Sequence, residues 1–300
     1  MNELETKLNT IKNVFDVEAI IKLKSDESYI QKYYKINQTP YTFFYNKDYI
    51  HFGISRDGIY KESDLLEQAR IIQNIIKENH STKVLELATG RGSNSFYLSN
   101  KFPHTEFYGI DISNAQLTHA YEKTAKVRNF HLKNEDYHNL KSFKSSSFDI
   151  VFVIEALCHS EDKNQVVSEV HRVLKPGGFF VIFDGYRNEE EKYSSNELLA
   201  MKLIERGLAL NKLETYKGFK NIIQKNNFTI IKEEDVSLYL IPSSKRMERL
   251  ADRYFHRPLL AKLLKIILPK KFLYNIPAGY LMPYAFRERL WVYMITILRK

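Results

Sequence analysis

Short apolar runs alternate with amphipathic stretches between residues 83 and 186, and this alternation constrains the fold more than any other feature of the chain. The apolar runs have the length and the composition of strands. They predict five strands, over residues 83–88, 106–111, 130–136, 148–157 and 179–186. Near-continuous apolar strands that are joined by helices indicate a parallel sheet covered on both faces.

Helical patterns precede, separate and follow these strands. Asp64 and Glu67 have the spacing of a capping box that opens a helix before the first strand. Ser113 is expected to cap one of the later helices, and the Lys-Pro-Gly-Gly sequence at 175–178 to end another. The later helices are predicted over residues 93–102, 113–127, 163–174, 194–213 and 215–226.

A sixth strand over residues 228–236 and a closing strand at the C-terminal end complete the prediction. The fold class is therefore α/β, with a doubly wound, mostly parallel sheet of seven strands. The chain has 300 residues and 44% hydrophobic content, enough for one large domain with insertions or for two small domains, and we favour one. We expect an N-terminal helical and aromatic cap, a core, a basic amphipathic helical insertion and a closing strand, over residues 1–62, 63–241, 242–289 and 290–300.

The cysteine content and the N-terminal sequence bear on the compartment. Cys158 is the one cysteine, which excludes an internal disulfide framework and a cysteine-based zinc cage and is typical of a reducing compartment. No metal site is predicted. The first residues do not have the pattern of a signal peptide, and no apolar run reaches the roughly 18 residues of a membrane span. We expect a cytoplasmic protein.

The stretch VLELATGRGSNS, from Val84 to Ser95, is the loop that follows the first strand. It has two of the three glycines of a dinucleotide-binding loop, Gly90 and Gly92, but Ser95 stands in place of the third. Glu86 at the strand end would repel a pyrophosphate, whereas it suits a ligand that carries an amine or a sulfonium. No Gly-Lys-Ser or Gly-Lys-Thr follows, which excludes a Walker loop.

This loop resembles the first motif of the class I S-adenosylmethionine-dependent methyltransferases, acid-x-Gly-x-Gly-x-Gly, with Ala88 in place of the first glycine. The resemblance implies a Rossmann-like fold and S-adenosylmethionine as cofactor. It continues through YGIDIS, where it implies that Asp111 accepts both ribose hydroxyls, and through NEDYHNL, where Asp136 would accept from the adenine amine and Tyr137 would pack on the ring. Structural roles compete with these, because two glycines often form an ordinary turn and an acid often caps a helix. The cofactor residues implied are Tyr45, Glu86, Ala88, Thr89, Gly90, Gly92, Asp111, Ile112, Gln116, Asp136, Tyr137 and Glu155.

The stretch EALCHS, which follows the fourth strand, resembles the Glu-Ala-x-Cys-His sequence of sterol and related lipid C-methyltransferases. The resemblance implies catalytic roles for Glu155 and His159, and Glu155 would orient the acceptor or take its proton. YIHFGI, with His51, is similar to the cap of the same enzymes and implies a third catalytic residue. The alternatives are that His159 only opens a loop and that His51 and Tyr45 only close a core.

The basic charge is concentrated near the C-terminal end. Residues 241–300 hold thirteen Lys or Arg against three acids, while the whole chain carries +9, so the remainder is close to neutral. Within 258–283, lysines alternate with leucines and isoleucines, a pattern typical of a helix on an anionic membrane surface. A lid packed on the chain's own core is the alternative. A nucleic-acid surface is disfavoured because it would not need so many aliphatic residues.

The sequence predicts a methyltransferase that acts on an apolar small molecule or lipid-like acceptor, such as a sterol, isoprenoid or quinone, with peripheral membrane contact. An RNA methyltransferase and an inactive cofactor-binding partner subunit remain as alternatives. No particular oligomeric state is predicted.

Overall fold

The computed structural model describes residues 2–188 and 193–300, and the chain separates into two compact units, each assembled from segments far apart in the sequence. The sheet unit consists of Glu62–Tyr186, Glu214–Val236 and Tyr293–Lys300. The helical unit consists of Met1–Lys61, Arg187–Leu213 and Ser237–Val292.

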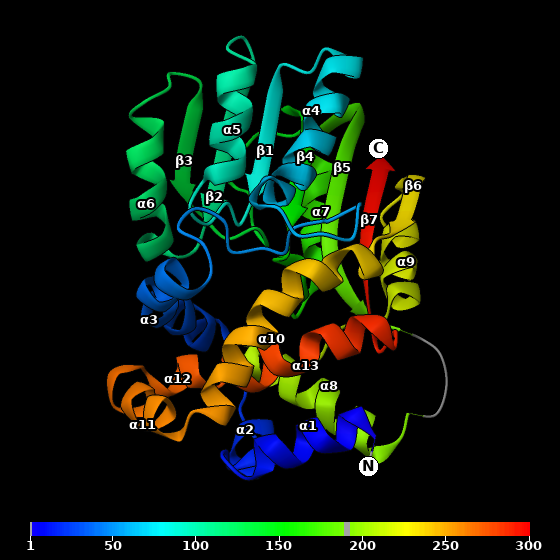
Figure 1. Ribbon diagram of the computed structural model, residues 1–300. Helices are drawn as coiled ribbons and strands as arrows, with labels where there is room; N and C mark the ends of the chain where they lie inside the picture. Colours follow the sequence, from blue (N-terminus) through cyan, green and yellow to red (C-terminus); the bar gives the residue numbers. More distant parts are fainter. Residues whose placement is uncertain (1, 189–192) are drawn as a thin grey trace. The chain divides into compact units, whose positions relative to one another are not determined.

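One sheet of seven strands runs through the described residues (Figure 1). Its strands are β1 (Lys83–Leu87), β2 (Glu106–Asp111), β3 (Phe130–Asn134), β4 (Phe148–Ile154), β5 (Leu174–Arg187), β6 (Thr229–Asp235) and β7 (Trp291–Arg299). They lie in the order β3-β2-β1-β4-β5-β7-β6. The pairs among β1 to β5 are parallel, and β6 pairs with β7 antiparallel. The α/β fold with a mostly parallel, seven-stranded sheet is thereby confirmed.

The strand order reverses direction between β3 and β4. From β1 the chain proceeds to β2 and β3 on one side and then crosses to β4 on the other side of β1. In doubly wound sheets ligands bind beyond the carboxyl ends of the strands at this switch point. The residues that end β1, β2 and β4 there are Leu87, Asp111 and Ile154.

The helices of the sheet unit form two groups (Figure 1). They are α4 (Glu67–Asn79), α5 (Ser93–Lys101), α6 (Asn114–Thr124), α7 (Lys163–Val173) and α9 (Tyr216–Lys225). α5 contacts both α4 and α6, while α7 contacts α9. The buried residues of α4 recur at helical spacing, which gives this helix one apolar face toward the sheet.

The predicted start of α4 is wrong. Glu62–Leu66 form a 3-10 helix, η1, and α4 begins at Glu67 with Leu66 at its N-cap and no side-chain cap. Ser113 caps α6 as predicted, because its side chain accepts from the N–H of Gln116.

Two further element ends differ from the prediction for local backbone reasons. β4 stops at Ile154, three residues earlier than expected, because Glu155 has a φ of 49°, which no strand residue adopts. The Lys-Pro-Gly-Gly sequence does not end a helix, since α7 has already ended at Val173 and β5 begins at Leu174.

The helical unit brings the N-terminal segment and the basic segment together. Its helices are α1 (Glu3–Lys12), α2 (Val17–Ile21), α3 (Glu27–Phe44), α8 (Ser195–Gly207), α10 (Ile241–His256), α11 (Pro258–Ile267), α12 (Lys270–Leu273) and α13 (Asn275–Arg287). α13 packs against α1, α8, α10 and α12, and α3 packs against α12. None of the helices described is both long and apolar enough to cross a membrane.

The turn between β1 and α5 depends on two glycines with positive φ. Gly90 has a φ of 55° and Gly92 a φ of 69°, and Gly92 is the N-cap of α5. A Cβ at Gly92 would lie 3.0 Å from the Cβ of Ala120 and 3.1 Å from the ring of Phe130. At Gly90 it would meet nothing within 4 Å. The positive φ favours glycine at both positions. Only at Gly92 do neighbouring side chains also leave too little space for a Cβ.

We predict that Gly92→Ala destabilises the protein more than Gly90→Ala. The positive φ costs about 1–2 kcal/mol at either position, and overpacking against α6 and β3 adds about 1–3 kcal/mol at Gly92 alone. Urea unfolding of the two variants measures the difference. Equal losses of stability in the two variants would show that the packing around Gly92 adds no cost to a Cβ at this position.

Candidate cofactor and acceptor site

The buried carboxyl group of Glu86 lies at the end of β1, between β2 and β4. It accepts hydrogen bonds from Thr89 Oγ1 at 2.7 Å, Ser95 Oγ at 2.5 Å and Asn94 Nδ2 at 3.3 Å. Burial raises the pKa of Glu86 to about 7, although these three hydrogen bonds oppose the rise. A carboxyl group with this pKa is ready to ionise when a cation binds beside it.

Asp111, the last residue of β2, holds two loops in place. Its carboxylate accepts from the N–H of Gly90 at 2.9 Å and from the N–H of Ser113 at 2.7 Å. Burial raises its pKa to about 6, and the same two hydrogen bonds act in the opposite direction. Ile112, half-buried, separates Asp111 from the cap of α6. The loops after β1 and β2 are therefore joined through one carboxylate at the switch point.

The loop after β1 has the backbone conformation that its motif requires. Ala88 has a φ of 49°, in the left-handed region where glycine is favoured, although it carries a Cβ. The N–H of Thr89 donates to the carbonyl of Ile110 at 2.8 Å, and the N–H of Gly92 donates to the carbonyl of Thr89 at 2.9 Å. Ala88 thus keeps the turn at the cost of local strain.

Gln116, in the first turn of α6, provides an observation that favours a ligand. Its side chain is buried, yet neither Oε1 nor Nε2 has a hydrogen-bond partner among the described residues. Buried amides are nearly always satisfied. A polar ligand at the adjacent ends of β1 and β2 would meet this requirement, so the residues present fit a cofactor with hydroxyl or amine groups.

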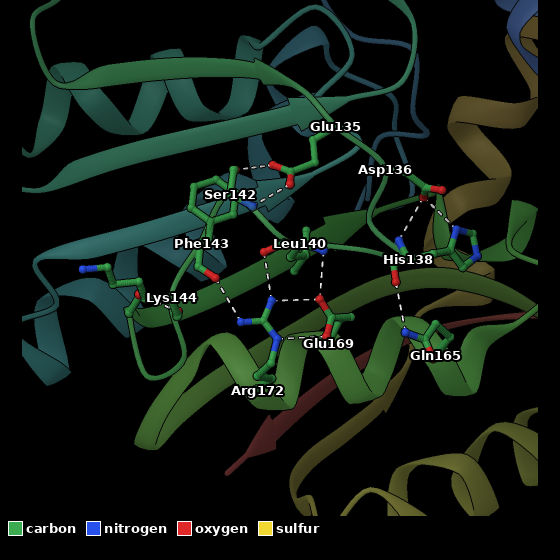
Figure 2. Close-up of polar contacts among 11 residues, drawn as sticks. Glu135, Asp136, His138, Leu140, Ser142, Phe143, Lys144, Gln165, Glu169 and Arg172 are labelled. Atoms are coloured by element: carbon green, nitrogen blue, oxygen red, sulfur yellow. Dashed lines mark hydrogen bonds and ion pairs between the residues drawn. The ribbon is translucent and has the colours of Figure 1, made fainter.

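Asp136, Tyr137 and His138 lie in the loop that follows β3, and Figure 2 shows Asp136 and His138. Asp136 Oδ1 accepts from the N–H of His138 at 2.9 Å and lies 2.7 Å from His138 Nδ1. His138 Nε2 is 2.8 Å from Ser160 Oγ. The hydroxyl of Tyr137 donates to the carbonyl of Ala156 at 3.2 Å. The loops after β3 and β4 are therefore connected twice.

The same loop is fastened to α7 by hydrogen bonds with Arg172 and Glu169, which form an ion pair within that helix, as Figure 2 shows. Arg172 Nη1 donates to the carbonyl of Phe143, and Arg172 Nη2 donates to the carbonyl of Leu140 and to Glu169. Glu169 in turn accepts from the N–H of Leu140 at 2.8 Å. The Arg172 guanidinium lowers the pKa of Glu169. This clamp fixes the path of the chain beyond Asp136 and Tyr137.

Glu155 follows β4 with its backbone in the strained left-handed region. Its Oε1 accepts from the hydroxyl of Tyr293 in β7 at 3.0 Å. The side chain of Gln68 is a second hydrogen-bonding partner of Tyr293, whose pKa is raised well above the usual value, mainly by burial. Tyr293 and Gln68 were not predicted from the sequence, because only the tertiary structure brings residues of β7 and α4 close to Glu155.

His159 and Cys158 lie in η2 (Leu157–His159), directly after Glu155 and Ala156. His159 is half-buried, and its N–H donates to the carbonyl of Ala156 at 3.1 Å. Burial and the nearby Asp184 raise the pKa of the Cys158 thiol well above its usual value, so the thiol stays protonated. The N–H of Cys158 donates to Asp184 at 2.9 Å.

Tyr45 and His51 belong to the helical unit and are described within it. The hydroxyl of Tyr45 donates to the carbonyl of His51 at 2.8 Å, and the guanidinium of Arg246 donates to the carbonyl of Tyr45 at 3.0 Å. His51 is buried, and its Nδ1 is 3.1 Å from the carbonyl of Phe52. The remaining predicted site residues lie in the sheet unit.

Residues 85–182 match the protein family described as "Methyltransferase domain". Phosphoethanolamine N-methyltransferase of Plasmodium falciparum is 26% identical over 259 residues, which are 85% of this chain and 88% of that protein. 24-methylenesterol C-methyltransferase 2 of Arabidopsis thaliana is also 26% identical, over 70% of this chain. This chain spans 58% of the length of the sterol enzyme.

Among solved structures, geranyl diphosphate C-methyltransferase of Streptomyces coelicolor A3(2) has a TM-score of 0.63 at 14% identity. The match covers 91% of this chain and 96% of that chain. That structure contains Mg2+, geranyl diphosphate and S-adenosyl-L-homocysteine. At this identity the likeness shows the fold.

We predict that Asp111→Ala weakens the binding of S-adenosylmethionine by about two orders of magnitude. The variant would lose the hydrogen bonds expected from the ribose hydroxyls to the Asp111 carboxylate, and each hydrogen bond to a charged acceptor contributes about 1.5–3 kcal/mol. Isothermal titration calorimetry measures the dissociation constant. Asp149→Ala is a matched control, since Asp149 also accepts from two backbone N–H groups, those of Thr82 and Lys83, but near the amino end of β4. Equal binding by the Asp111 variant and the wild type would remove Asp111 from the site.

Proposed function

We propose that this chain, an S-adenosylmethionine-dependent methyltransferase by its family match and its relatives, methylates an apolar, lipid-like small molecule of the sterol, isoprenoid or quinone type. The observation that carries the proposal is the carboxyl group of Glu155, which Tyr293 holds at the carboxyl end of β4. A carbon or hydroxyl acceptor is a weak nucleophile and requires a base, which a fixed carboxylate provides. An amine acceptor has less need of one.

We assign the cofactor to the ends of β1, β2 and β3. Asp111 accepts the ribose hydroxyls, Asp136 and Tyr137 bind the adenine, and Gln116 satisfies its buried amide on the cofactor. Glu86 faces the positively charged part. When bound, the cofactor supplies a methyl group on a sulfonium sulfur, an activated carbon that needs alignment with the acceptor more than chemical assistance.

We assign the acceptor to the loop that follows β4. Glu155 orients the acceptor and receives its proton, while Tyr293 positions the Glu155 carboxylate through a hydrogen bond of 3.0 Å. The backbone of Glu155 is in the strained left-handed region, with a φ of 49°. His159, four residues later, and His51 of the helical unit remain proposed catalytic residues. The similarity to 24-methylenesterol C-methyltransferase 2 supports an apolar acceptor.

A phosphorylated amine is the second candidate acceptor. The phosphoethanolamine N-methyltransferase of Plasmodium falciparum matches more of this chain than the sterol enzyme does, 85% against 70%. Incubation of the protein with cell extract and S-adenosylmethionine that carries a labelled methyl group distinguishes the two. Label in the organic extract supports the proposal. Label in phosphoethanolamine or in RNA contradicts it, and absence of transfer despite cofactor binding would indicate an inactive subunit.

We predict that Glu155→Gln lowers kcat by a factor of about 10² to 10⁴, the usual contribution of a positioned base. Tyr293→Phe removes one hydrogen bond to Glu155 and is expected to lower kcat by about tenfold. Tyr293→Phe should bind S-adenosylmethionine with nearly the wild-type dissociation constant. Steady-state assays with the identified acceptor measure kcat, and an unchanged kcat for Glu155→Gln excludes Glu155 as the base.

A further inference from the structure

Helix α11 exposes a stripe of large apolar side chains. No residue of α11 is buried. Leu259, Leu263, Ile266 and Ile267 are 85%, 52%, 79% and 63% exposed, respectively. Their spacing of four, seven and eight residues from Leu259 places them on one face of the helix. The other apolar side chains of α11, including Leu260 and Leu264, are partly covered.

The charged residues that neighbour the stripe in the sequence are all of one sign. Residues 257–271 contain Arg257 and four lysines and no acidic residue. Lys262, Lys265 and Lys270 are exposed. Lys271 differs, because its Nζ lies 3.9 Å from the centre of the Tyr29 ring and so contributes to packing within the unit. The exposed face of α11 is therefore apolar with a cationic border.

Different occupants of this face have different chemical requirements. A second copy of the chain, docked face to face by a two-fold axis, would oppose two sets of lysines and be repelled. A nucleic acid would match the charge but would leave the leucines and isoleucines without apolar contact. The surface of an anionic bilayer matches both, since acyl chains accept the apolar stripe and the headgroups attract the lysines.

We propose that α11 is a membrane-docking helix, which lies in the interface of an anionic bilayer with Leu259, Leu263, Ile266 and Ile267 inserted among the acyl chains. Pro258 begins the helix and Pro269 follows its end, so α11 is a short separate element of ten residues. Docking is a property of this surface and does not depend on which acceptor is methylated.

The test is cosedimentation of the full chain with vesicles of phosphatidylcholine alone and of phosphatidylcholine with phosphatidylglycerol. The wild type should bind the mixed vesicles at least about tenfold better, and added salt should weaken this binding. The apolar variant Leu259→Ser/Leu263→Ser/Ile266→Ser and the charge variant Lys262→Glu/Lys265→Glu/Lys270→Glu should each lose at least about tenfold in partitioning.

A matched control is Ile59→Ser/Leu238→Ser/Ile231→Ser, which removes three apolar side chains that are more than half exposed elsewhere. It should bind like the wild type. Circular dichroism and S-adenosylmethionine binding establish that every variant is folded. The proposal fails if the wild type stays in solution with both vesicle types or if the control loses binding equally. It also fails if light scattering shows a dimer that the apolar variant dissociates.

Discussion

The burial of the Glu86 carboxyl group at the end of β1 is the constraint on which the rest of the site depends. Burial alone would keep the group protonated, and its pKa is accordingly raised to about 7. The three side chains that hydrogen-bond to it come from the turn and the start of α5, so the same loop that displays Gly90 and Gly92 also satisfies the acid. A cationic ligand beside Glu86 would favour the ionised form of its carboxyl group. The ionisation of Glu86 therefore depends on whether the ligand is bound.

The core of the fold and the sheet edge that carries the candidate site residues were predictable from the sequence. Parallel strands place their carboxyl ends at one edge, so residues near the ends of separate apolar runs, such as Glu86 and Asp111, lie along that edge. Local signals also located the cap at Ser113. The start of α4 was misplaced because a 3-10 turn precedes the helix, and the end of β4 was misplaced because the strain at Glu155 leaves no compositional signature.

Other features require the tertiary structure. Tyr293 reaches Glu155 only because β7 lies beside β5 in the sheet order, and His138 joins Asp136 to Ser160 through a loop whose course α7 fixes. The sequence could not decide whether the basic segment packs on the chain or faces outward. In the structure, both descriptions apply to different helices. α13 is largely buried, whereas α11 is exposed.

The measurement that tests this account most directly is the number of protons released when the cofactor binds at pH 7. Calorimetry in buffers of different ionisation enthalpy gives this number. In the free protein Glu86, with a pKa of about 7, is partly protonated. The sulfonium of S-adenosylmethionine should lower this pKa and release protons, whereas the neutral thioether of S-adenosylhomocysteine should release fewer. Glu86→Gln should abolish the difference between the two ligands. Equal proton release for both ligands in the wild type would contradict the assignment of Glu86 to the sulfonium of the cofactor, because both ligands carry the amine.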